Sequence, residues 1–143
     1  QRAKCIVFAD FDSADRTFSY SIKPGLESRG GSDITLLSID STVRTDSYWS
    51  DSNFMQFGKF RVLRWDKKIS LPKSGERLKV DILVLSHNPV QRLADIKAIV
   101  EFKKVLIDPT NSEYKIRGWL SEAEKLNISA YVLKKSPAYI IKL

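Results

Sequence analysis

Four residues that directly follow apolar runs of this chain are of the types that bind metal ions or transfer protons. Asp10 and Asp12 follow one apolar run, the only histidine, His87, follows a second, and Asp108 follows a third. Because the carboxyl ends of parallel strands meet at one edge of a sheet, we expect these side chains to converge if their strands run parallel. Carboxylates together with an imidazole could hold a divalent ion. A metal-dependent phosphodiesterase or nuclease with an atypical site is therefore one hypothesis for the chain.

Two observations weaken the metal hypothesis. One imidazole cannot complete a catalytic zinc site of the usual kind, which takes about three protein ligands. The spacing matches no recognised ligand motif, and Asp and Asn are common between strands and helices because their side chains bond to free backbone groups. Cys5 is the only cysteine, so a thiolate cage and an intrachain disulfide are excluded. On balance we expect no bound metal and no cofactor.

Nucleophilic catalysis is favoured even less. A triad can be written from Ser86 or Ser136 with His87 and Asp108, but neighbouring residues on a strand point to opposite faces, which separates Ser86 from His87. The chain has no nucleophile-elbow motif. It also has no glycine-rich phosphate loop, since residues 29–31, RGG, lack the required spacing.

Positive charge is concentrated in the middle of the chain. The net charge is +7, and residues 54–79 carry eight basic and two acidic side chains. Such an excess attracts phosphate polymers or anionic lipid through a salt-sensitive term that is independent of sequence. The alternative is a solvated hairpin whose lysines protect an edge strand from aggregation. The candidate nucleic-acid contacts are Lys59, Arg61, Arg64, Lys67 and Lys68.

The elements that must position these residues form a mixed α/β pattern. The 143 residues suit one domain with one core, and no apolar run reaches the ~18 residues of a membrane span. A helix capped by Ser13 is expected over 16–22, ending before Pro24-Gly25, and 41–53 is expected to be a long loop. A hairpin is expected around Gly58-Lys59. The expected strands are 4–9, 34–39, 54–57, 60–65, 80–86, 104–107, 130–133 and 138–141, and the later helices are 91–101 and 112–126.

The order of strands and helices in the second half predicts the topology. Strand, helix, strand, helix and two final strands indicate parallel βαβ units, with an antiparallel pair at the end of the chain. The strand at 80–86 is almost entirely apolar, as in strands buried on both faces. We therefore predict an α/β fold with a mixed sheet.

The second half also resembles a known family. Residues 80–89, VDILVLSHNP, resemble the strand and loop that carry a His-His-Gly motif in the metallo-β-lactamase-like domain of ComEC-family DNA-internalisation competence proteins. Residues 105–112, VLIDPTNS, resemble the following strand and polar loop, and 119–141 fit the closing helix and strand pair. Residues 6–10 and 57–63 are similar to strands of a shortened version of that domain.

The differences from that family bear on activity. The His-x-His-x-Asp-His run that binds metal in the family is absent, Asn88 follows His87, and Pro89 stands in place of the glycine. The resemblance therefore implies a truncated branch without the metal-binding motif, in which Asp10, Asp12, His87 and Asp108 mark a vestigial site.

These observations lead to one principal hypothesis. Residues 1–143 are expected to be a single soluble domain, excised from a larger membrane protein and exposed on the outer side of the bacterial cytoplasmic membrane. It would be non-catalytic, contact DNA weakly through the basic hairpin, and have the transmembrane portion of the same polypeptide as its partner. A domain that only packs against that membrane portion and binds no DNA is a third hypothesis.

Overall fold

The computed structural model of the protein describes residues 3–9, 16, 18–38, 41–67, 69, 75–136, 139 and 141. These residues form two compact units, 1–43 and 44–143. A division into compact units does not decide whether the whole chain folds as one domain, so the single-domain organisation stays a prediction.

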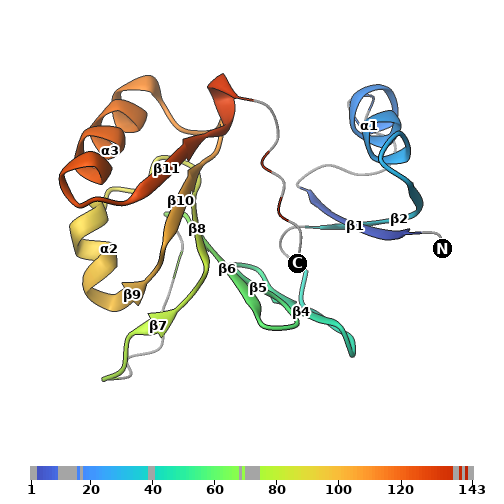
Figure 1. The fold of residues 1–143 in the computed structure, drawn as a ribbon, viewed down its shortest axis with the longest axis horizontal. Helices are drawn as coiled ribbons and strands as arrows, with labels where there is room; N and C mark the ends of the chain where they lie inside the picture. Colours follow the sequence, from blue (N-terminus) through green and yellow to red (C-terminus); the bar gives the residue numbers. More distant parts are fainter. Residues whose placement is uncertain are drawn as a thin grey trace. The chain divides into compact units, whose positions relative to one another are not determined.

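The first unit is a small βαβ arrangement (Figure 1). Strand β1 (Ala3–Ala9) pairs in parallel with β2 (Gly31–Ser38), and the π-helical turn η1 (Phe18–Ile22) and helix α1 (Lys23–Glu27) lie between them in the sequence. The expectation that Pro24-Gly25 would interrupt the helix is wrong. Proline fits the first turn of α1 because no backbone N–H is needed there. Ser13, Asp10 and Asp12 lie outside the described residues.

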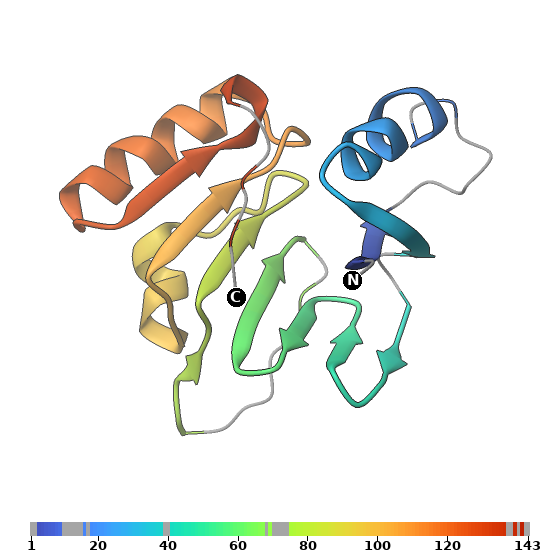
Figure 2. The same ribbon diagram turned by 45° about the vertical axis from the view of Figure 1, so that its right-hand side comes forward.

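The second unit is built on a mixed sheet of seven strands. Their order is β11-β10-β8-β6-β5-β4-β3, and the arrows of β6, β8, β10 and β11 point the same way (Figure 2). The antiparallel pairs β4-β5 and β5-β6 extend the sheet on one side. The strands are β3 (Val43–Arg44), β4 (Tyr48–Asp51), β5 (Phe54–Phe57), β6 (Phe60–Trp65), β8 (Ile82–Leu85), β10 (Lys104–Ile107) and β11 (Ser129–Val132).

This sheet confirms the predicted α/β class and its parallel βαβ units. The hairpin formed by β5 and β6 is confirmed at the predicted residues. After β11 the chain forms a short 3₁₀ turn, η2 (Leu133–Lys135). Most of the expected last strand, 138–141, lies outside the described residues, so the terminal antiparallel pair stays a prediction.

The prediction of a long loop over 41–53 is wrong. Strands β3 and β4 lie within it, and β4 pairs with β5 so that Tyr48 lies opposite Phe57. Their rings stack with centroids 6.1 Å apart. Aromatic pairs of this kind stabilise neighbouring strands, and here they offset the Ser, Thr and Asp content that suggested a loop.

The core of the second unit lies between the sheet and two helices. Helices α2 (Leu93–Ile99) and α3 (Glu113–Lys125) cover the same face of β8 and β10 (Figure 1). Complete burial of each large aliphatic side chain contributes about 1.5–3 kcal/mol, so this layer fixes the strand ends on which the candidate sites are built. The fully buried side chains include Leu63, Leu83, Leu85, Leu93, Ile96, Val105, Ile107 and Ile116.

Two short strands extend beyond the helical layer. Strand β7 (Leu78–Lys79) pairs in parallel with β9 (Val100–Glu101), and Val80 N donates a 2.9 Å hydrogen bond to Glu101 O. This pair lies immediately before β8 and β10 in the chain and therefore borders the amino ends of the central strands.

Candidate functional site

The carboxyl edge of the sheet carries His87 and Asp108, and hydrogen bonds hold it together. The hydroxyl of Ser86, which is fully buried, donates a hydrogen bond to Asp108 Oδ2. The other carboxylate oxygen, Oδ1, accepts hydrogen bonds from the Thr110 hydroxyl and, at 2.9 Å, from Thr110 N. Oδ2 of Asp108 therefore joins the ends of β8 and β10, and Oδ1 holds the loop that follows β10.

His87 enters this network through its backbone. His87 and Asn88 have φ angles of 58° and 51°, in the left-handed region. This conformation aims His87 N at Thr110 Oγ1, 2.7 Å away, and Asn88 N at Asn111 Oδ1, 2.9 Å away. The His87 side chain is exposed. Its place in the loop is thus defined by main-chain geometry.

Two asparagines complete the connection between the loops. Asn88 Oδ1 accepts a 2.7 Å hydrogen bond from Ser112 N, the residue that caps α3. Asn111, only 2% exposed, donates from Nδ2 to Leu85 O at 2.7 Å. Buried amides with several partners are typical of rigid polar networks. We therefore interpret the two loops as one structural unit.

This geometry bears on the catalytic hypotheses. Ser86 donates to Asp108 and makes no hydrogen bond to His87, so the described contacts do not form a triad. Among the residues that the structure describes, no group of three or more His, Cys, Asp or Glu side chains could hold a metal ion. Asp10 and Asp12 lie outside those residues, so their convergence with His87 and Asp108 stays a prediction.

The opposite, amino edge of the sheet gathers cations. Lys59, Arg61, Lys79 and Lys103 line a hollow of about 290 Å³ that also includes Asp81 and Glu101. We call these four cations the amino-edge basic set. All four are exposed, and Asp81 Oδ2 accepts a 2.8 Å hydrogen bond from Arg61 N. Four cations against two carboxylates leave this edge with a positive charge.

The register of the parallel strands brings these cations together. Val62 of β6 pairs with Ile82 of β8, and Ile82 pairs with Lys104 of β10. Arg61 and Lys103, which directly precede Val62 and Lys104, therefore lie at the same edge of the sheet. Lys79 and Lys103 were not among the predicted DNA contacts. The signal that could have found them is a lysine shortly before each of the apolar strands β8 and β10, read together with a parallel arrangement.

The remaining predicted contacts occupy different surroundings. Lys67 is exposed, and Lys68 lies outside the described residues. Arg64 is only 8% exposed, and its Nη2 donates a 3.2 Å hydrogen bond to Asp66 Oδ2. Burial beside a carboxylate makes Arg64 a poor candidate for contact with a phosphate.

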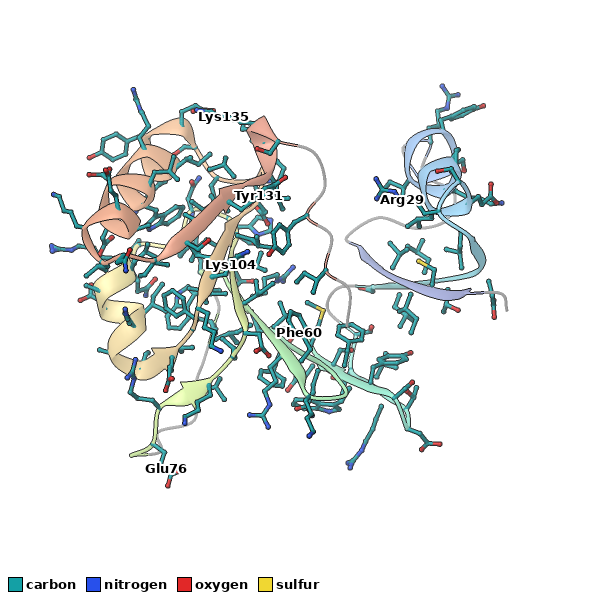
Figure 3. All side chains as sticks on the ribbon, viewed as in Figure 1. Arg29, Phe60, Glu76, Lys104, Tyr131 and Lys135 are labelled. Atoms are coloured by element: carbon teal, nitrogen blue, oxygen red, sulfur yellow. The ribbon has the colours of Figure 1, made fainter. Side chains whose placement is uncertain are left out.

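Lys104, another basic residue, lies on the face of the sheet that α2 and α3 do not cover. Lys104 forms a hydrogen bond with the hydroxyl of Tyr139, and its Nζ lies 4.6 Å from the centroid of that ring. Tyr131 of β11 packs against the same ring with centroids 5.1 Å apart; Lys104 and Tyr131 are labelled in Figure 3. Lys104 is therefore engaged within the protein.

No helix among the described residues is long and apolar enough to cross a membrane. No curated protein and no solved structure matches the chain. The comparison with protein families is positive: residues 1–143 match the family described as ComEC C-terminal domain. The match covers the whole chain and confirms the resemblance carried by residues 80–89 and 105–112. The chain belongs to the family of ComEC C-terminal domains, from membrane-associated proteins of competence DNA uptake.

Proposed function

We propose that this is a non-catalytic, extramembrane domain that guides DNA by weak contacts with its phosphate backbone. The observation that carries the proposal is the amino-edge basic set, in which Lys59 and Arg61 of the predicted hairpin lie with Lys79 and Lys103 around one hollow. Cations in a concave surface concentrate a polyanion without reading its sequence. Because the chain belongs to a family of DNA-uptake proteins, we infer that this polyanion is DNA.

The non-catalytic part of the proposal is supported by the use of Asp108 and His87. The Asp108 carboxylate accepts hydrogen bonds from Ser86 and Thr110, and His87 contributes a backbone N–H to the loop connection. A carboxylate committed to structural donors has less capacity to bind a metal ion or accept a substrate proton.

The proposed setting is the outer side of the bacterial cytoplasmic membrane, with the transmembrane portion of the same polypeptide as the protein partner. In that place a positive surface would attract incoming DNA toward the membrane. The contacts are solvent-exposed and few, so we expect low affinity and high sensitivity to salt.

The experiment compares two double variants with the same loss of charge. Arg61→Ala with Lys103→Ala removes two cations of the amino-edge basic set. The matched control, Arg44→Ala with Lys125→Ala, removes one arginine and one lysine of the same unit that are also exposed but do not line this hollow. Binding of a fluorescent DNA duplex is measured by anisotropy at several salt concentrations.

Removal of two phosphate contacts should make the fall of log affinity with log salt less steep, by about 2 in the slope. The control should leave the slope unchanged. Equal changes in the two double variants would show that only net charge matters. No change in either would contradict the proposed contact surface.

A further inference from the structure

A second hollow lies beside α3, away from the amino-edge basic set. It has a volume of about 550 Å³ and is lined by the start of the α2 region and by the side of α3 that includes Tyr114, Arg117 and Gly118. We call it the α2–α3 groove. Its size is that of a small-molecule site, since ligand pockets are commonly about 300–1,000 Å³.

The α2–α3 groove carries cations without matching free carboxylates. Arg92, Lys115 and Arg117 line it, and within the described part of the chain none of them forms an ion pair. Glu122 is the only acidic residue in the lining. The charge of the groove therefore favours an anionic ligand.

Glu122 is already committed within the protein. Its Oε2 accepts a 2.9 Å hydrogen bond from Leu93 N and its Oε1 accepts a 2.8 Å hydrogen bond from Ala94 N. These are free N–H groups of the first turn of α2, so the carboxylate satisfies the helix start. Its charge faces the positive end of a helix, which leaves the three groove cations less neutralised.

The groove also presents an exposed aromatic ring. Tyr114 is 79% exposed, and Val90, which also lines the groove, is 75% exposed. Trp119 also lines the groove but is almost fully buried, and its Nε1 donates a 3.2 Å hydrogen bond to Gln91 O. An exposed ring on a rigid helix, next to cations, is a surface on which a planar ligand can stack.

Gly118 keeps the groove open. It lies in the middle of α3, where glycine costs about 1 kcal/mol relative to alanine. Its φ angle is not positive, and a Cβ built there would meet nothing within 4 Å. Backbone geometry and packing therefore do not require glycine, whereas a side chain would project into open space in the groove lining.

We propose that the α2–α3 groove binds a nucleoside phosphate. The base stacks on Tyr114, and the phosphate contacts Arg92 and Arg117, whose guanidinium groups are suited to phosphate oxygens. The ligand has two sources, a free nucleotide or an unpaired nucleotide within single-stranded DNA. A base-paired duplex cannot offer an unstacked base. The site is separate from the amino-edge basic set and does not depend on it.

The test uses two variants that report on the groove in different ways. Gly118→Leu places a side chain in the groove lining at a position where a Cβ meets nothing within 4 Å, and it replaces glycine by a strong helix former, so thermal stability should rise while binding falls. Tyr114→Ala removes the ring, and Tyr114→Phe keeps it as the matched control. Affinities are measured for thymidine monophosphate, oligothymidylate, and an oligonucleotide of the same length made only of abasic sites.

Tyr114→Ala should weaken oligothymidylate binding about 5- to 100-fold, Tyr114→Phe should bind as the wild type does, and the abasic strand should not respond to either change. If thymidine monophosphate and oligothymidylate both bind, the ligand of the groove is a nucleotide in general. If only oligothymidylate binds, the ligand is a nucleotide within single-stranded DNA. Wild-type affinity in Gly118→Leu, or equal effects of Tyr114→Ala on the abasic strand, would overturn the proposal. Failure here leaves the response of duplex binding to Arg61 and Lys103 unaffected, so the two proposals are tested separately.

Discussion

The buried hydroxyl of Ser86 donates a hydrogen bond to Oδ2 of Asp108, and this contact joins the carboxyl ends of two neighbouring parallel strands. In a hydrolase, a carboxylate at this edge would face the substrate or a metal ion. Here it is tied to the serine of one strand and, through Oδ1, to the threonine of its own loop. Ser86, Asp108 and Thr110 thus form a structural connection between the two strand ends.

The first prediction concerns this connection. Ser86→Ala leaves an oxygen of Asp108 without its buried donor, so the free energy of unfolding should fall by about 1–3 kcal/mol. Chemical denaturation measures the change. Ser121→Ala, on the exposed side of α3, is the matched control and should stay within about 0.5 kcal/mol of the wild type. Equal stability of Ser86→Ala and the control would contradict a structural role for the hydrogen bond.

The second prediction concerns the backbone of His87. A non-glycine residue in the left-handed region costs about 1–2 kcal/mol, and the exposed imidazole makes no described hydrogen bond in return. His87→Gly should therefore be as stable as the wild type or more stable, and His87→Val should be clearly less stable, since a β-branched residue tolerates this region poorly. Thermal unfolding compares the two variants. A strongly destabilised His87→Gly would show that the imidazole itself supports the fold.

Catalysis provides the third prediction. When the purified domain is incubated with single-stranded DNA and manganese or zinc, we expect no cleavage of the DNA. The same result is expected for the wild type and for His87→Ala. Denaturing gel electrophoresis with a labelled strand is the measurement. Metal-dependent cleavage that disappears in His87→Ala would establish the rival hypothesis of a phosphodiesterase with an atypical site.

The fourth prediction is a pH dependence at the start of α3. Hydrogen bonding and charge attraction from Lys135, and then from Lys134, lower the pKa of Glu113 from its ordinary value of 4.5. Both ammonium groups lie 3.4 Å from the carboxylate. A carboxyl whose pKa is lower in the folded state stabilises the protein above its unfolded pKa, and that stability is lost as the pH falls through the folded pKa.

The wild type should therefore be slightly more stable than Glu113→Gln at neutral pH, and the difference should vanish as the carboxyl becomes protonated below 4.5. Thermal unfolding at a series of pH values measures it. Because the pair is exposed, raised salt should also reduce the difference. A difference that persists in acid would point to a cause other than charge.

The sequence predicted well where apolar periodicity and burial agree. The strand around Leu83, the helix around Trp119 and the hairpin around Gly58 all formed close to the expected residues. The segment 41–53 was misassigned because local Ser and Asp content suggested a loop, while Tyr48 gains its strand conformation from a partner on β5. This pairing is a tertiary contact, and the strand propensities of the local residues do not reveal it.

The candidate sites show the same limit. Lys59 and Arg61 could be selected from the charge of one segment, whereas Lys103, about forty residues further on, joins them only through the parallel register. Arg64 belongs to the same charged segment but is buried with Asp66, because the second half of β6 is buried throughout, from Leu63 to Trp65. Charge counts therefore located the basic segment, and the topology decided which of its cations are exposed.

The salt dependence of DNA binding by the wild-type domain tests the central claim most directly. With two to four phosphate contacts, the affinity for duplex DNA should fall about 10- to 150-fold between roughly 50 and 200 mM monovalent salt. An affinity that does not change over this range, or no binding at the lower concentration, would contradict the proposal that the domain guides DNA through its amino-edge basic set.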